Sequence, residues 1–146
     1  MLIPTPTPRG FTLIELMITL VIIAILTAVI VPSYQTHVQK GYRTDAVSSI
    51  GSILNGMERY YADNVTYTTE LDKLGFTLVG SGSTAYLKTD ADRYRIQARA
   101  CSGMSLTQCV EVVAVAQGKQ AGDGNLVANT MGRAVRIMPD NSETSW

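Results

Sequence analysis

Residue types that build catalytic and metal sites are scarce in this chain. Among its 146 residues there is one histidine, His37, and there are two cysteines, Cys101 and Cys109. A zinc site therefore lacks ligands, and a nucleophile has no second histidine to act as its base. The sequence also holds no phosphate-binding loop and no HExxH pattern. We expect neither a catalytic site nor a bound metal or other cofactor.

Charge is also scarce, and it is balanced. The chain contains twelve lysines and arginines and twelve aspartates and glutamates, and charged residues make up 16% of it. Because neither sign is in excess, the composition gives no general attraction to nucleic acid or to an anionic membrane surface.

Hydrophobic residues, by contrast, are abundant at 46%, and many of them gather at residues 11–31. This stretch contains one charged residue, Glu15, and three threonines. As a helix rising 1.5 Å per residue it would be about 30 Å long, which matches the hydrocarbon thickness of a bilayer. The pattern predicts one membrane-spanning helix.

The flanks of this span differ from those of an ordinary secretory signal, in which small residues follow a shorter apolar run. Here Pro32 follows the run, and the small residue, Gly10, precedes it. Cleavage between Gly10 and Phe11 would remove residues 1–10 as a leader and would leave the apolar helix on the mature chain.

The string GFTLIEL, from Gly10 to Leu16, followed by an apolar run that ends at Pro32, resembles the N-terminus of type IV pilins and pseudopilins. The resemblance covers about the first third of the chain and points to a minor pilin of the PilE-like type. It implies that a prepilin peptidase cuts after Gly10 and methylates Phe11. It also implies assembly, with other pilin subunits and on an inner-membrane platform, into a surface filament for motility, adhesion or DNA uptake. Before assembly, the subunit would lie in the inner membrane with its head in the periplasm.

Glu15 has a physical reading beside this resemblance. A carboxylate inside an apolar span costs of the order of 2–4 kcal/mol near the bilayer centre and less near an interface. In a filament core, a Glu15 carboxylate paired with the Phe11 amine of a neighbouring subunit would offset both desolvation costs and set the axial register. The alternative is an interfacial glutamate without a partner. We expect the register role, and we take Phe11, Glu15 and Pro32 as assembly residues.

The remaining pattern predicts an α+β fold. Apolar residues at intervals of three and four continue the helix to about Ala62, and Pro32 should kink it. Residues 92–100 alternate strictly, residues 110–116 are rich in valine, and residues 126–129 and 133–138 flank a turn. We expect the long helix to pack on a four-stranded antiparallel sheet, the ladle fold of pilins. The expected parts are a leader (1–10), a transmembrane and filament-core helix (11–31) and a periplasmic head (32–146).

Cys101 and Cys109 bracket a short loop between the first two of these strands. Two cysteines in an exported domain usually pair, so we expect a disulfide. Many pilins carry their bridge at the C-terminal end of the chain. The tail after Pro139 has no such bridge here, and we expect it to be mobile.

Two weaker signals concern ligands. Arg93, Arg95 and Arg99 share one face of a predicted strand and could contact DNA phosphates or a neighbouring subunit. Alternation alone also places long polar residues on a solvated sheet face, and we favour that reading, which leaves DNA a less favoured partner. The loop at residues 122–125 could offer oxygen ligands to calcium, but we favour a plain turn.

Two other functions stay open beside the minor pilin. One is a type II secretion pseudopilin, against which the cysteine pair argues. The other is a single-span, membrane-anchored binding domain that never polymerises. Processing at Gly10 separates the anchored domain from the other two, because an anchored domain has no need of it. The sequence does not separate a major from a minor pilin.

Overall fold

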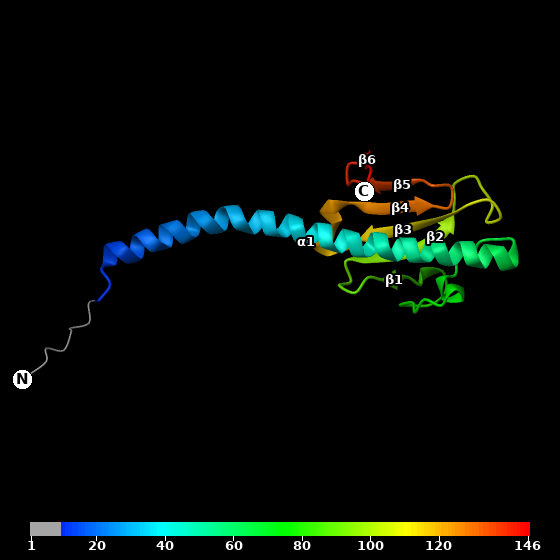
Figure 1. Ribbon diagram of the computed structural model, residues 1–146, viewed down its shortest axis with the longest axis horizontal. Helices are drawn as coiled ribbons and strands as arrows, with labels where there is room; N and C mark the ends of the chain where they lie inside the picture. Colours follow the sequence, from blue (N-terminus) through cyan, green and yellow to red (C-terminus); the bar gives the residue numbers. More distant parts are fainter. Residues whose placement is uncertain (1–9) are drawn as a thin grey trace, which may run out of the picture. The chain divides into compact units, whose positions relative to one another are not determined.

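The computed structural model describes residues 10–146 and begins with one long helix, α1 (Leu13–Asn64) (Figure 1). Apart from Gly10, the expected leader lies outside the described residues. The chain divides into two compact units, one ending at Val38 and one running from Gln39 to Trp146. We describe each unit by itself.

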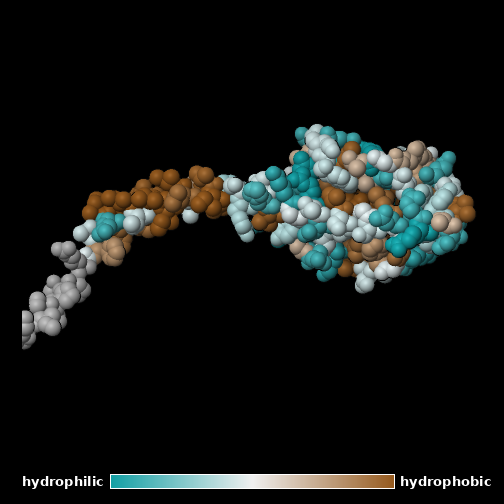
Figure 2. Space-filling view, in the orientation of Figure 1, coloured by the Kyte–Doolittle hydropathy of each residue, from teal (hydrophilic) through white to brown (hydrophobic). Residues whose placement is uncertain are grey.

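The first unit is the apolar part of α1. Its large side chains are exposed along the whole stretch, from Phe11 (84% exposed) to Val31 (49%). Figure 2 shows a largely hydrophobic surface here, with a few polar residues near its start. The helix is long and apolar enough to cross a membrane, with a mean hydropathy of 2.9 over its most apolar window. The helix continues through Pro32, and the expected kink at that residue stays a prediction.

The second unit contains a sheet in which each strand pairs antiparallel with the next along the chain. This order needs only short connections between neighbouring strands. The strands are β1 (Leu87–Lys88), β2 (Tyr94–Ala100), β3 (Val110–Ala116), β4 (Asn125–Asn129), β5 (Ala134–Ile137) and β6 (Glu143–Thr144).

The expected α+β fold is confirmed, but the sheet has six strands instead of four. The two missed strands, β1 and β6, have two residues each, too few to show an alternating pattern. The prediction of a mobile tail is wrong as well, because β6 pairs with β5 and Trp146 packs against the core. A single tryptophan at the chain end carries no periodic signal.

Short 3₁₀ helices fill the connections. The first, η1 (Leu71–Leu74), ends at Gly75, whose φ of +88° is left-handed, as expected for a helical turn that a glycine terminates. The others are η2 (Gly82–Thr84) and η3 (Gly118–Asp123). The loop expected at residues 118–125 is therefore partly helical.

The core of the second unit forms where α1 covers one face of the sheet (Figure 1). Alternation along β2 puts Tyr94 and Ile96 on this covered face. Arg95 and Arg99 consequently lie on the other face, which we call the outer face. The fully buried helix residues recur at intervals of three and four, as an amphipathic helix requires: Ala46, Ile50, Ile53 and Met57.

Candidate functional site

Thr12 and Glu15 fix the start of α1. The Glu15 N–H donates a hydrogen bond to Thr12 Oγ1 at 3.3 Å, so Thr12 caps one of the free backbone donors of the first turn. The spacing Thr-x-x-Glu is that of a capping box, and a glutamate in the first turn also favours the helix dipole. The sequence analysis missed this signal. Glu15 contributes its backbone N–H to this cap, and the pairing of its carboxylate with a neighbour's Phe11 stays a prediction.

Gly10, Phe11, Glu15 and Pro32 all lie in the first unit, and all are exposed. Their roles in cleavage, methylation and assembly stay predictions. The exposed apolar surface around them is expected to be buried in a membrane or against other protein chains, because monomeric soluble proteins rarely expose apolar patches beyond a few hundred Å².

Cys101 and Cys109 form the predicted disulfide, with Cα atoms 5.5 Å apart. They close the loop between β2 and β3, and Cys109 is fully buried. The next residue, Val110, exchanges hydrogen bonds with Thr130 in the β4–β5 turn. The bridge therefore braces this end of the sheet.

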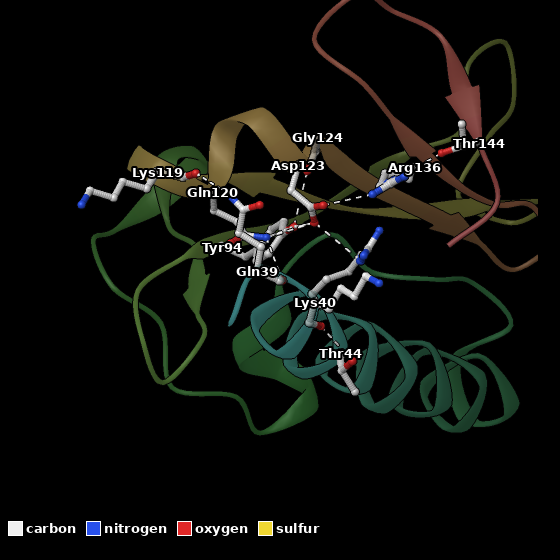
Figure 3. A network of polar contacts seen from close by, with 11 residues as sticks. Gln39, Lys40, Thr44, Tyr94, Lys119, Gln120, Asp123, Gly124, Arg136 and Thr144 are labelled. Atoms are coloured by element: carbon white, nitrogen blue, oxygen red, sulfur yellow. Dashed lines mark hydrogen bonds and ion pairs between the residues drawn. The ribbon is translucent and has the colours of Figure 1, made fainter. Parts of the chain in front are cut away.

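A network of polar contacts centres on Asp123 at the end of η3 (Figure 3). The Arg136 guanidinium lies 3.0 Å from Asp123 Oδ1, and Arg43 Nε lies 3.5 Å from Oδ2. Gln120 and the Tyr94 hydroxyl also donate to Oδ2, at 3.0 and 3.3 Å. The Asp123 side chain is only 10% exposed, so both arginines balance a nearly buried charge.

The network joins four segments of the second unit. Arg43 comes from α1, Tyr94 from β2, Gln120 from η3 and Arg136 from β5. Gln120, which is 1% exposed, also donates to the Gln39 carbonyl at 3.1 Å. Burial raises the pKa of Tyr94 to about 12, while its hydrogen bond with Gln120 lowers the pKa in part. No local sequence pattern predicts this cluster, because its members come from separate elements and lie up to 97 residues apart in the chain.

The carboxylate that a calcium ion would need from residues 122–125 is thus held by two guanidinium groups and an amide. Asn125, the other oxygen donor there, accepts from the Ala116 N–H at 2.9 Å. Within residues 10–146 we find no cluster of three or more His, Cys, Asp or Glu side chains that could hold a metal ion. The loop acts as a brace between elements.

The three arginines singled out in the sequence have different surroundings. Arg93 lies over the Tyr42 ring at 5.5 Å, and Arg99 pairs with Glu111 at 2.6 Å. Arg95 lies over the Tyr86 ring at 4.7 Å. The guanidinium of Arg95 is in no ion pair with a described residue.

Lys88 adds a second exposed cation beside Arg95. The two residues are direct cross-strand partners of β1 and β2, and both are exposed on the outer face. Like charges directly opposite each other destabilise a sheet, and no described carboxylate pairs with either one. We call Lys88, Arg95, Arg99 and the ring of Tyr86 the cationic strip. The turn between its strands carries Asp90 and Asp92, so the strip is narrow.

Comparison with known proteins bears on both units. The family model "Type IV minor pilin ComP, DNA uptake sequence receptor" matches residues 32–127, and "Prokaryotic N-terminal methylation motif" matches residues 7–31. A fimbrial protein of Pseudomonas aeruginosa is 35% identical over 107 residues, which cover 66% of this chain and 70% of the relative.

Two other relatives match over shorter stretches. Type II secretion system core protein G of Escherichia coli (strain K12) is 38% identical over 65 residues, 44% of this chain and 45% of the relative. Fimbrial protein EcpC of Eikenella corrodens is 34% identical over 74 residues, 51% of this chain and 48% of the relative. The chain thus spans about half of the length of these two relatives.

Proposed function

Because the chain belongs to the type IV pilin family and, within it, to the minor pilins, we propose that it is a filament subunit that receives DNA on its cationic strip. Two facts support the DNA part. The matching family model is described as a DNA uptake sequence receptor. In addition, Lys88 and Arg95 lie side by side on an exposed sheet face, and no carboxylate of the described residues pairs with either one.

The strip suits phosphate contacts better than base reading. Two adjacent cations can neutralise neighbouring phosphates and release their counterions, which is the main source of affinity that does not depend on sequence. The Tyr86 ring beneath Arg95 restrains the guanidinium and leaves its edge free to donate hydrogen bonds. The structure therefore favours a narrow contact with the DNA backbone.

The test is DNA binding by the full chain in neutral detergent micelles, followed by fluorescence anisotropy of a labelled duplex over a range of salt concentrations. For the Lys88→Gln/Arg95→Gln double variant we expect weaker binding and a salt slope reduced by about two, because each lost phosphate contact removes about one unit. Both residues are exposed, so the fold should be unchanged.

Lys73→Gln is the matched control. Lys73 is an exposed cation outside the strip, and its charge is already paired with Glu70. An equal loss in this control, or an unchanged salt slope in the double variant, would remove the strip from the proposal. Neither result would bear on filament assembly.

The assembly part rests on the exposed apolar helix and on the methylation motif. A prepilin peptidase would cut between Gly10 and Phe11 and methylate the new amine. The subunit would lie in the inner membrane, with its head in the periplasm, until an assembly platform moves it into a filament with other pilins. There Glu15 would pair with the Phe11 amine of a neighbour.

Glu15→Gln tests the pairing without removing the helix cap, since the N–H that bonds to Thr12 belongs to the backbone. The variant should be processed, inserted and folded, yet poorly incorporated, because the Phe11 amine loses its partner on leaving the lipid. The measurement is the ratio of protein in sheared filaments to protein in membranes. An unchanged ratio would remove the pairing of Glu15 with Phe11 from the proposal.

A pseudopilin of type II secretion is the second candidate, and the similarity to core protein G supports it. Sheared surface filaments that contain the chain would favour the pilus. A chain found only in the cell envelope, together with a loss of protein secretion on its deletion, would favour the pseudopilin.

A further inference from the structure

One edge of the sheet is left open at the end of β2. The short strand β1 pairs only with Arg95 and Ile96, so among residues 10–146 no strand lies beside the last residues of β2 on that side. In an antiparallel pair, alternate residues bond to opposite neighbours. Thr89 N–H donates to the Tyr94 carbonyl, so even-numbered residues of β2 face the β1 side. The backbone N–H and C=O groups of Ala98 and Ala100 therefore face the open edge.

The ladder stops because the chain before β1 turns away. Since Leu87 pairs with Ile96, Ala85 would be the next partner, opposite Ala98. Instead, the Ala85 N–H donates to the Gly82 carbonyl at 3.1 Å. The Ala85 carbonyl accepts from the Gln97 side chain, also at 3.1 Å. Within the described residues, no backbone hydrogen bond joins Ala98 to Ala85.

A groove of about 820 Å³ runs beside this edge. That volume lies within the range of binding sites for small ligands and short peptides. Its lining includes Gln97 and Ala98 from β2, Gly80 and Ser81 from the connecting loop, and Glu70 and Asp72 beside η1. The small side chains of Ala98 and Ala100 leave the edge accessible.

The charge of the groove restricts its occupant. Glu70 pairs with Lys73 at 3.1 Å, whereas Asp72 is in no ion pair with a described residue and is exposed. Of these two carboxylates, which we call the acidic wall, Asp72 therefore keeps a charge that no described cation balances, and it would repel an anionic group placed next to it. A cationic side chain would be attracted.

We propose that this groove binds an extended peptide segment of another protein, which adds as a strand to the open edge of β2 and places a lysine or arginine beside Asp72. The peptide backbone would pair with Ala98 and Ala100, which supplies affinity, and the acidic wall would select a cation. The groove adjoins the cationic strip, because its lining residue Gln97 lies between Arg95 and Arg99 on the outer face. The proposal nevertheless does not depend on DNA binding or on filament assembly.

The test uses the ¹⁵N-labelled full chain in neutral detergent micelles and the probe peptide acetyl-Thr-Val-Lys-Val-Thr-amide. Titration by NMR should shift the amides of Ala98 and Ala100 and slow their hydrogen exchange at least about tenfold at saturation, because strand addition protects both groups. A second peptide with glutamate in place of lysine should bind at least about tenfold more weakly. No protection at these two amides would overturn the proposal.

Two variants sharpen the test. Ala98→Pro removes one donor on the open side without removing a bond to β3, since proline is tolerated at such edge positions, and it should abolish peptide protection at Ala100. Asp72→Lys should invert the preference, so that the glutamate peptide binds more tightly than the lysine peptide. Asp72 is exposed, so this swap stays informative even if the proline variant does not fold. An unchanged preference would overturn the acidic-wall argument.

Discussion

Asp123→Asn should destabilise the head much more than an ordinary surface substitution. The change keeps the shape of the side chain but removes the only carboxylate that pairs with Arg43 and Arg136 among the described residues. These two arginine side chains are only 18% and 19% exposed, so neither can recover full hydration. Two nearly buried cations would then lie close together without an anion.

The magnitude follows from this burial. Breaking a buried ion pair by removing one partner typically costs about 3–5 kcal/mol. The residual exposure of both arginines reduces this cost, and we expect a loss of about 2–3 kcal/mol in the free energy of unfolding. For a unit of this size, such a loss lowers the melting temperature by roughly 10 °C or more.

Urea unfolding of the full chain in neutral detergent measures the loss. Urea is uncharged and does not screen the ion pairs, and Trp146, the only tryptophan, packs against the core and reports on unfolding by fluorescence. Glu143→Gln is the matched control, because it removes a carboxylate from an exposed ion pair. In that pair the Arg133 side chain is 41% exposed and the Glu143 side chain is 49% exposed. Exposed pairs contribute up to about 1 kcal/mol.

Similar small losses in the two variants would refute the reasoning. A further variant separates charge from packing: Asp123→Leu with Arg43→Met and Arg136→Met removes all three charges together. Replacing a complete buried ion cluster by apolar groups is often neutral. We therefore expect this triple variant to be more stable than Asp123→Asn alone.

Three further predictions concern the head. The pKa of Tyr94 is raised to about 12 from 10, so its contribution to stability should persist below pH 10 and disappear between pH 10 and 12; ultraviolet titration should show a late-ionising tyrosine that Tyr94→Phe removes. Cys101→Ser should cost about 2–3 kcal/mol in urea unfolding, and thiol labelling of the native protein should fail. Gly124→Ala should cost at least about 2 kcal/mol, since its φ is +89° and a Cβ there would lie 2.5 Å from the Ile137 carbonyl oxygen; normal stability would contradict this close approach.

The parts of this protein that repeat a local pattern could be predicted from the sequence. The apolar run before Pro32, the alternation in β2 and the valines of β3 each carry their own periodicity, so the helix and the central strands were predictable. Cys101 and Cys109 are near in sequence and have no competing partner, which made the disulfide predictable.

The missed features depend on distant residues. Asp123 is an unremarkable turn residue in sequence, and only the fold brings Arg43 and Arg136 to its two oxygens. Lys88 could not be singled out from the sequence for the same reason, because its position opposite Arg95 depends on the register of β1 and β2. An exposed cation becomes a candidate contact only when its surroundings show that no carboxylate neutralises it.

The sequential strand order also bears on how the head forms. Every strand from β2 to β6 pairs with the strand before it, and the covering segment of α1 precedes them all. A chain that emerges N-terminus first can therefore complete each hairpin as it appears, with no strand waiting for a later one to be inserted between its neighbours. Such local pairing favours rapid folding and shortens the time that free edges are available for aggregation. β6 and Trp146 follow β5 in the sequence, so a head truncated after β5 would lack them and keep β5 as an open edge.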